Sequence, residues 1–405
     1  MWTVNMGKMR DRASVAASCA FVVGMLSLLG ADAGAQRAQG PDVVKVTANG
    51  TSFALENRAI GANWSTGDGE TPKLAITDRL HRAEVRVEDP FRILLADGTV
   101  LNARSLRLVG NGKYVHIAPD SGSSRVAGAV PGESVETAFE SADKTIHLDW
   151  SVVLLEGSNY IRQVLRIQAQ GEKDVPISRV ELIDLNLPNA RVEGTVAGSP
   201  IVAGNVFAGF EHPLSSSKVT GSRAEAWIER ELPLKAGQSV TYSSVIGVAH
   251  DGQMRRDFLA YLERERAHPY RTFLHYNSWY DLGYFTPYMA SDAVDRINAF
   301  GHELTEKRGV KLDSFLFDDG WDKHDSLWKF NSGFPDGFTP LRDAAAKYGA
   351  APGVWMSPWG GYSKPKQERI AFGKNAGYEI VSGGYALSGP KYYEAFKDVA
   401  LEMVK

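Results

Sequence analysis

Acidic and indole side chains concentrate at three places in the C-terminal third of the sequence. These places are Asn277-Ser278-Trp279-Tyr280-Asp281, Phe317-Asp318-Asp319-Gly320-Trp321-Asp322 and Gly353-Val354-Trp355-Met356-Ser357-Pro358-Trp359. An ionised carboxylate accepts strong hydrogen bonds from hydroxyl groups, and an aromatic face packs against the apolar side of a pyranose ring. This combination of residue types predicts a site that binds a sugar.

Each of the three segments falls at the end of a predicted strand. Apolar strands are predicted at 272–279, 312–317 and 351–356. Helices are predicted from a cap at Ser291 to Gly309, from Thr339-Pro340 to Gly349, and near 366–376 and 391–405. Alternating strands and helices imply parallel strands. The three segments should therefore meet at the carboxyl edge of one sheet, which is where βα barrels carry their active sites.

Residues 36–250 are predicted to form a large β-sandwich. Ile146, Leu148 and Trp150 alternate with polar residues at a period of two. Turn signals such as Gly110-Asn111-Gly112 recur between the apolar runs. Many short strands without helical periodicity favour a sandwich. Residues 251–269 are then predicted as a linker helix, with Met254, Phe258, Tyr261 and Leu262 on one face.

The same residues also have ordinary structural interpretations. Asp318-Asp319 before Gly320 is compatible with turn chemistry and a helix cap, and each tryptophan is compatible with a place in the core. Their shared position at the ends of successive strands favours a binding site. Asp318 and Asp319 cannot easily act from both sides on one bond of a bound ligand, because adjacent strand residues point to opposite faces.

The first 35 residues have the features of a signal peptide. Lys8, Arg10 and Arg12 precede an apolar stretch over 13–30, and Ala33-Gly34-Ala35 forms a small-residue cleavage site. A membrane anchor is the alternative, but the stretch is short for a span of about 20 residues. We therefore expect a secreted or periplasmic protein, cleaved after Ala35, with no stable membrane anchor.

Charge and cysteine content narrow the partners further. The formal net charge of −3 leaves no electrostatic footprint for nucleic acid. The single cysteine, Cys19, lies inside the predicted signal peptide, so the mature chain would have no disulfide and no cysteine metal site. We expect no metal and no organic cofactor, and the sequence leaves the oligomeric state open.

The stretch 273–405 resembles the start of the catalytic barrel in the melibiase superfamily, the α-galactosidases and α-N-acetylgalactosaminidases of glycoside hydrolase families twenty-seven and thirty-six. The motifs that carry the resemblance are Asn277-Ser278-Trp279, Phe317-Asp318-Asp319-Gly320-Trp321, Phe334-Pro335-Asp336-Gly337, and Gly353-Val354-Trp355 followed by Pro358. The all-β domain ahead of them favours the family thirty-six arrangement. The resemblance implies a multidomain β plus α/β protein, in which the sandwich precedes a (β/α)8 TIM barrel.

The resemblance also implies roles for the site residues. Asp318 and Asp319 would bind hydroxyls of the non-reducing sugar, and Trp279, Trp321 and Trp355 would shape the pocket. Enzymes of this superfamily are retaining and use a nucleophile and an acid/base carboxylate. In the family, the nucleophile belongs to a lysine-x-aspartate motif on the fourth strand, and the acid/base follows the sixth strand.

We expect the barrel in this sequence to be incomplete. A full barrel takes about 250 residues, and residues 270–405 have room for about three of its strands. The nucleophile and the acid/base are therefore expected beyond Lys405, and no residue of the sequence is assigned a catalytic role. The 405-residue chain alone is expected to be inactive.

The expected function is an exo-acting retaining glycoside hydrolase that cleaves terminal α-linked galactose or N-acetylgalactosamine from an oligosaccharide or glycan. The alternative is a non-catalytic carbohydrate-binding protein with a retained sugar pocket. An open doubly wound domain is a third possibility. It would need a phosphate-binding glycine loop after its first strand, where Asn277-Ser278-Trp279 has bulky residues.

Overall fold

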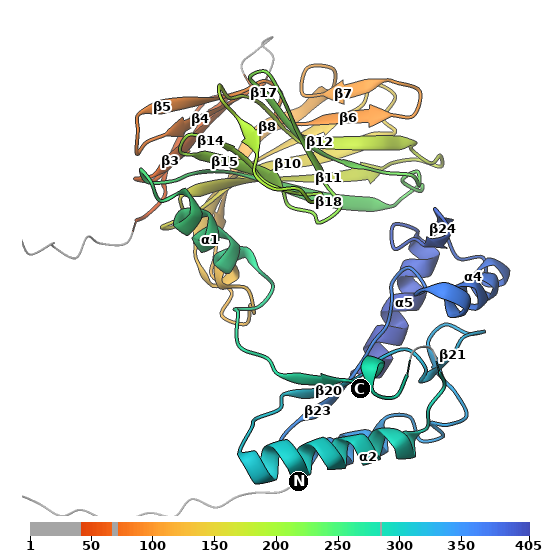
Figure 1. The fold of residues 1–405 in the computed structure, drawn as a ribbon. Helices are drawn as coiled ribbons and strands as arrows, with labels where there is room; N and C mark the ends of the chain where they lie inside the picture. Colours follow the sequence, from red (N-terminus) through yellow and green to blue (C-terminus); the bar gives the residue numbers. More distant parts are fainter. Residues whose placement is uncertain (1–41, 67–71, 284–285) are drawn as a thin grey trace, which may run out of the picture. The chain divides into compact units, whose positions relative to one another are not determined.

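The computed structural model describes residues 42–66, 72–283 and 286–405. The predicted signal peptide, with Cys19 and the cleavage site at Ala35, lies outside the described residues. Among the helices in the described ranges, none is long and apolar enough to cross a membrane. Two antiparallel sheets occupy the first part of the described chain, and three parallel strands with helices follow (Figure 1).

The first sheet contains ten strands. They are β1 (Lys45–Asn49), β2 (Ser52–Glu56), β3 (Ile60–Ser65), β4 (Lys73–Asp78), β5 (Ala83–Val87), β6 (Arg92–Leu95), β7 (Val100–Asn102), β12 (Ile177–Asn186), β16 (Ser216–Thr220) and β17 (Arg223–Glu229). Their order is β1-β2-β3-β4-β5-β12-β17-β16, and β6 pairs with both β12 and β7.

The second sheet contains eight strands. They are β8 (Arg107–Ile117), β9 (Gly132–Glu140), β10 (Ile146–Leu155), β11 (Tyr160–Ala169), β13 (Arg191–Val192), β14 (Ile201–Ala203), β15 (Val206–Phe210) and β18 (Ser239–Val248). Their order is β13-β14-β15-β18-β11-β10-β9-β8, and the 3-10 turn η1 (Val126–Ala129) precedes β9.

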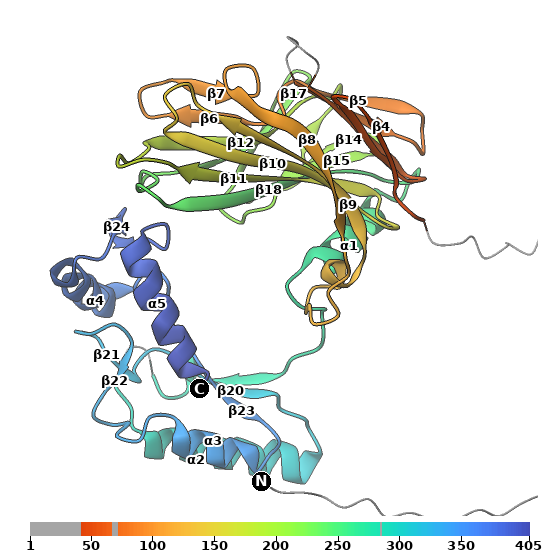
Figure 2. The same cartoon turned by 180° about the vertical axis from the view of Figure 1, so that it is seen from behind.

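The two sheets pack face to face around one apolar core, as expected for a sandwich (Figure 2). The predicted alternation on β10 is confirmed, because Ile146, Leu148 and Trp150 are all buried. Trp64 of β3 lies against Trp150 with ring centroids 4.3 Å apart. The indole N–H of Trp64 donates to Thr137 Oγ1 of β9 at 2.8 Å. Each large apolar side chain buried in this way contributes roughly 1.5–3 kcal/mol to stability.

One predicted turn is wrong. Gly110-Asn111-Gly112 lies inside β8, where the register against β9 shifts between Val109 and Lys113. Gly110 has φ +70°, a left-handed conformation that suits glycine. A bulge and a tight turn both use this conformation, so the glycines alone do not distinguish them.

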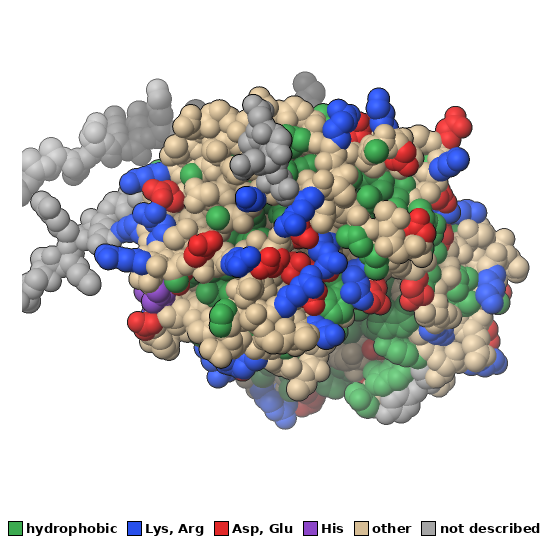
Figure 3. All heavy atoms as spheres, turned by 90° about the horizontal axis from the view of Figure 1, so that it is seen from above, with side chains coloured by type: hydrophobic (Ala, Val, Ile, Leu, Met, Phe, Trp, Pro, Cys, Tyr) green, Lys and Arg blue, Asp and Glu red, His purple; other side chains and the backbone are tan. Residues whose placement is uncertain are grey.

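The first sheet carries a charged cluster on the side away from the core. Glu181 and Asp184 of β12 and Glu225 of β17 lie with carboxylate oxygens within 4.8 Å of one another. Arg223 binds Asp184 through two bonds of 2.9 Å, whereas the nearest cation to Glu181, Arg92, is 3.4 Å away. Burial raises the pKa of Glu181 to about 7. Seen from above, the molecule shows Lys and Arg side chains interleaved with Asp and Glu (Figure 3).

Helix α1 (Met254–Glu265) is fixed to the sandwich. Phe258 and Tyr261 lie against Phe207 of β15 with centroids 5.2 and 5.7 Å apart. The Tyr261 hydroxyl donates to Glu211 at 2.7 Å. Leu262 was predicted on the same helical face but is 38% exposed. The helix therefore buries a narrower face than the one that the sequence predicts.

The remaining described residues form a parallel α/β unit. Its elements are β19 (His275–Asn277), η2 (Ser278–Tyr280), α2 (Ala290–Phe300) with its π-helical extension η3 (Gly301–Glu306), β20 (Ser314–Phe317), β21 (Asp322–Lys323), β22 (Lys329–Phe330), α3 (Thr339–Ala346), β23 (Ala351–Val354), α4 (Ser363–Ala376), β24 (Ile380–Val381), β25 (Gly384–Tyr385) and α5 (Pro390–Met403). Strands β19, β20 and β23 pair in parallel in that order, which confirms the predicted alternation. Helices α2 and α3 lie side by side against the sheet (Figure 2).

Two local predictions in this unit are wrong. The strand predicted at 272–279 spans only His275–Asn277. It ends early because the Asn277 side chain accepts the Trp279 N–H at 2.8 Å and starts the 3-10 turn η2. The cap of α2 is Met289 and not Ser291, since Asp292 accepts the Met289 N–H at 2.9 Å. The predicted start of α3 at Thr339-Pro340 is confirmed.

Candidate functional site

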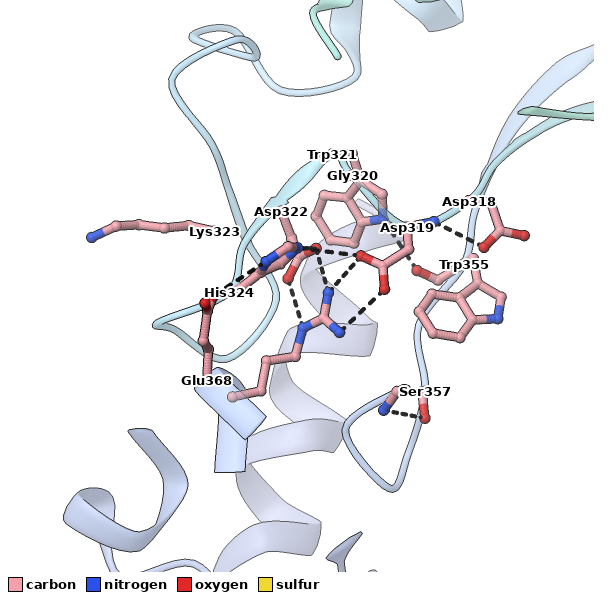
Figure 4. A network of polar contacts seen from close by, with 12 residues as sticks. Asp318, Asp319, Gly320, Trp321, Asp322, Lys323, His324, Trp355, Ser357 and Glu368 are labelled. Atoms are coloured by element: carbon pink, nitrogen blue, oxygen red, sulfur yellow. Dashed lines mark hydrogen bonds and ion pairs between the residues drawn. The ribbon is translucent and has the colours of Figure 1, made fainter. Parts of the chain in front are cut away.

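The three segments that were singled out in the sequence come together at one end of the parallel sheet. Asn277 Nδ2 donates to Asp318 Oδ2 at 3.3 Å and joins the ends of β19 and β20. Trp321 Nε1 donates to the carbonyl oxygen of Trp355 at 3.1 Å and joins the ends of β20 and β23 (Figure 4). The three segments therefore meet at the carboxyl edge of one parallel sheet, which is where the sequence predicted them.

Asp318 is 9% exposed and is held by groups from two neighbouring segments. Its backbone N–H donates to Ser278 Oγ at 2.8 Å, and the Tyr288 hydroxyl donates to its carbonyl oxygen at 2.8 Å. Oδ1 accepts the Asp319 N–H at 2.9 Å. Within the described residues, the hydrogen bond found for Oδ2 is the longer one from Asn277. A carboxylate oxygen has two lone-pair sites, so Oδ2 keeps the capacity to accept a further donor.

The Asp319 side chain lies in a fully buried ion pair with Arg369. Its Oδ1 and Oδ2 accept from Arg369 Nη2 at 2.8 Å and Nη1 at 3.4 Å. The same guanidinium donates to Asp322 through Nη2 at 2.7 Å and Nε at 3.0 Å (Figure 4). All three side chains have no exposed surface. One cation therefore compensates two buried carboxylates.

Burial and hydrogen bonding oppose each other at these two carboxyl groups. For Asp319, burial is the largest single influence and raises the pKa. The bonds from His324 and Arg369 together outweigh it, so the pKa lies below its usual range. For Asp322, burial is again the largest influence, and the pKa stays above its usual value despite Arg369. The site thus holds Asp319 ionised more firmly than Asp322.

His324 contacts the same cluster. Its Nε2 lies 3.4 Å from Asp319 Oδ1, and its Nδ1 lies 3.4 Å from Glu368 Oε2. The contact with Asp319 raises the pKa of the imidazole, partly offset by burial. A protonated His324 would therefore balance the carboxylate charge that Arg369 leaves uncompensated.

The buried arginine also packs against a group of indole rings. The guanidinium of Arg369 lies 4.1 Å from the ring centroid of buried Trp328, in cation–π contact. Trp321, fully buried, stacks on Trp328 with centroids 6.2 Å apart and an interplanar angle of 24°. Trp355 meets Trp328 edge-on at 5.8 Å and is partly exposed, as is Trp279 on η2. Trp355 and Trp279 are therefore partly accessible residues, whereas Trp321 is a core residue.

The acidic cluster also has the spacing of a metal site. Asp319, Asp322 and His324 can each direct one ligand atom to within 4.8 Å of the others. Arg369 Nη2 already lies within 2.8 Å of an oxygen of each aspartate. The guanidinium thus takes the place that a cation would need.

Sequence reasoning missed Arg369, His324 and Trp328. Arg369 comes from α4 and lies 47 and 50 residues after its two partners in sequence. The sequence offers only a weak signal, the spacing of Pro365, Arg369 and Gly373 at intervals of four, and the structure shows that this face of α4 is buried. An arginine at a core position of a helix predicts a buried acidic partner.

A scan against protein-family models and a search of curated proteins found no match. Among solved structures, the α-galactosidase of Lactobacillus brevis is similar with a TM-score of 0.52 and 12% identity, over 87% of this chain and 62% of that chain. A family thirty-six α-galactosidase of Geobacillus stearothermophilus gives a TM-score of 0.48 and 15% identity, over 78% and 57%. A β-arabinopyranosidase gives 0.45 and 12%, over 88% and 64%.

The chain spans less than two thirds of the length of each of these solved chains. At 12% identity, the similarity to the Lactobacillus protein concerns the fold. The described part of this chain therefore has an α-galactosidase-like fold.

Proposed function

We propose that this chain is part of an α-galactosidase-type glycoside hydrolase and that its strand-end site binds the terminal hexose of a glycan. One observation carries the proposal: Asn277, Asp318 and Trp355 lie at the carboxyl ends of three neighbouring parallel strands, and hydrogen bonds between these strand ends hold the segments together. In βα barrels this edge of the sheet carries the active site. The fold shared with the Lactobacillus α-galactosidase supports the same reading.

The proposal gives the residues two kinds of role. Asp318 offers Oδ2 as an acceptor for a sugar hydroxyl, and Trp279 and Trp355 offer aromatic faces to the ring. Asp319 and Trp321 support the site from within, through Arg369 and the carbonyl of Trp355 respectively. A direct contact of Asp319 or Trp321 with the sugar stays a prediction.

We further propose that β19, β20 and β23 are the first strands of a (β/α)8 barrel. Their parallel order and the helices between them support this architecture. Retaining hydrolysis needs two carboxylates roughly 5–5.5 Å apart that are free to act on the substrate. Asp319 and Asp322 are both bound to Arg369, so we assign neither as a catalytic residue. The nucleophile and the acid/base would belong to other strands of the barrel.

The resemblance in sequence and the shared fold support a proposal for the substrate class. We propose a terminal α-linked galactose or N-acetylgalactosamine as the bound sugar, carried by an oligosaccharide. The N-terminal sequence supports the further proposal that the protein is secreted or periplasmic. N-terminal sequencing of the protein recovered outside the cytoplasm tests that proposal, and a chain that begins at Gln36 is the expected result.

Calorimetric titration of the full chain with methyl α-D-galactopyranoside tests the sugar site. We expect saturable binding. Asp318→Asn should weaken it about tenfold or more, because a hydrogen bond to a charged group is worth roughly 1.5–3 kcal/mol. Trp355→Phe should also weaken it. The matched control is Trp227→Phe in β17 of the sandwich, which should bind as the wild type does. Absence of binding, or equal affinity for all variants, would refute the proposal.

A further inference from the structure

Trp328 combines a buried side chain with a backbone conformation that bulky residues rarely adopt. It is 1% exposed and its φ is +52°. The other non-glycine residues with positive φ in the described ranges are all exposed: Arg82, Lys144, Asn189, Ser363 and Ser382. A bulky residue in this left-handed region is strained and stays there only where the surrounding structure imposes the conformation. Such strain is concentrated at functional sites, which points to a role for Trp328 beyond filling the core.

The hairpin that carries Trp328 has a fixed base. Trp328 is the last residue of the loop that joins β21 to β22. Directly after β22, Asn331 donates its backbone N–H to the carbonyl oxygen of Trp321 at 3.0 Å and its Nδ2 to that of Gly320 at 2.8 Å. These bonds tie the end of the hairpin to the segment that presents the acidic residues. The loop therefore closes over a short, fixed distance, and the indole of its last residue is buried.

Two groups hold the Trp328 ring, and Trp355 rests on it. Trp321 stacks on the ring at 6.2 Å, and the Arg369 guanidinium lies 4.1 Å from its centroid. Trp355 meets it edge-on at 5.8 Å and 83°, one of the geometries that aromatic pairs prefer. Tyr362 also lies against Trp355, at 6.3 Å, but it is 53% exposed and so constrains the ring less. The orientation of the Trp355 ring therefore depends chiefly on Trp328.

Arg369 cannot easily move away from the Trp328 ring. Besides its bonds to Asp319 and Asp322, its Nη1 donates to the carbonyl oxygen of Gly360 at 3.2 Å. Gly361 has φ +90°, and a Cβ added there would lie 2.7 Å from Arg369 Nη1, so the close packing requires glycine. The guanidinium is thus confined on several sides, and Trp328 lies against a rigid support.

We propose that Trp328 is a positioning residue of the sugar site, which holds the Trp355 ring in the orientation that meets the pyranose face. This inference rests on the proposed function, which assigns Trp355 to the sugar. Trp328 is too deeply buried to touch the sugar itself and acts through Trp355. A ring that is oriented before the ligand arrives lowers the entropic cost of binding. The strained backbone at Trp328 is then the means by which the hairpin places this ring.

Calorimetric titration of the full chain with methyl α-D-galactopyranoside tests the inference. Trp328→Phe should weaken binding about 2- to 10-fold, the range that the geometry of an aromatic contact gives. In the Trp355→Ala background the same replacement should change the affinity by less than about twofold, because no ring remains to be oriented. The control is Trp150→Phe, which alters a fully buried indole of the sandwich core and should bind as the wild type does. Trp328→Tyr replaces the phenylalanine variant if that variant does not fold.

The outcomes separate the inference from the proposed function. Equal weakening by Trp328→Phe in both backgrounds, or wild-type affinity in Trp328→Phe, would overturn the inference and leave the proposed function standing. No binding by the wild type would overturn both. If Trp355→Ala binds too weakly to titrate, a crystal structure of Trp328→Phe decides. We expect the Trp355 ring turned from its wild-type orientation or present in two orientations, and an unchanged ring would overturn the inference.

Discussion

Replacement of Arg369 by methionine is expected to destabilise the α/β unit strongly. The Arg369 side chain has no exposed surface and makes four hydrogen bonds to Asp319 and Asp322. Methionine would fill much of the volume of the side chain but would leave two buried carboxylates with protonated His324 as the one cation near them in the described part of the chain. Removing one partner of a buried ion pair costs about 3–5 kcal/mol. We therefore expect a loss in the free energy of unfolding within that range.

The two aspartates should account for most of that loss. In the variant Arg369→Met/Asp319→Asn/Asp322→Asn, no buried charge remains without a partner. We expect this triple variant to recover at least about 2 kcal/mol relative to Arg369→Met alone, because an uncompensated buried charge is the larger part of the cost. With Asp319→Asn/Asp322→Asn in the presence of Arg369 as the third variant, the cycle gives the coupling between the arginine and its carboxylates.

Urea unfolding followed by tryptophan fluorescence is a suitable assay, because Trp328 contacts Arg369, and Trp321 and Trp355 both contact Trp328. The matched control is Arg179→Met, on the sandwich. Arg179 also covers an indole, with 4.4 Å to the Trp227 ring, but its side chain is 36% exposed and pairs with the exposed Glu229, so its loss should cost less than about 1 kcal/mol. A loss below about 1 kcal/mol for Arg369→Met, or a triple variant no more stable than the single one, would refute the reasoning.

Three further predictions concern the protonation of Glu181 and His324 and the packing of Gly361. The pKa of Glu181 is raised to about 7 in the folded chain, so the folded state loses stability as pH rises from the unfolded pKa of 4.5 through 7. At pH 8, Glu181→Gln should therefore be more stable than the wild type by roughly 2–3 kcal/mol. Urea unfolding of both proteins at pH 5 and pH 8 measures this difference. The pKa of His324 is raised above 6.5, so an NMR titration of the imidazole should give a midpoint above 6.5. The contribution of His324 to stability is present below pH 6.5 and is lost as pH rises through the pKa of the folded state. Gly361→Ala should cost about 1–3 kcal/mol in urea unfolding, and more than Gly349→Ala, since a Cβ at Gly349 meets open space at a similar positive φ.

Each of these three has an outcome that would contradict it. A Glu181→Gln variant that is less stable than the wild type at pH 8 would show that Arg92 compensates the buried charge fully. An imidazole midpoint at or below 6.5 would show that the Asp319 carboxylate does not raise the pKa of His324. An equal loss of stability in Gly361→Ala and Gly349→Ala would show that Arg369 does not pack closely against Gly361.

Much of the fold was predictable because its signals are local. The alternation of Ile146, Leu148 and Trp150 identifies a strand with one buried face. The order of strand and helix patterns identifies parallel pairing. Details that depend on a single side chain were not predictable in the same way. The Asn277 side chain ends β19 early, and Asp292 moves the cap of α2 to Met289.

The candidate site was predictable in outline. Parallel pairing joins the three segments, and the alternation of neighbours sends Asp318 toward Asn277 and Asp319 toward Arg369. The ion pair itself was not predicted, because its two sides lie 50 residues apart and only the packing of α4 brings them together. The burial of Trp321 likewise depends on Trp328, whose ring lies beneath it.

A crystal structure of the full chain with bound galactose would test the central claim most directly. The account predicts a sugar hydroxyl within hydrogen-bonding distance of Asp318 Oδ2, about 2.5–3.0 Å, with the ring face against Trp355 or Trp279. Galactose bound elsewhere on the chain, with Asp318 and both indoles unoccupied, would contradict it.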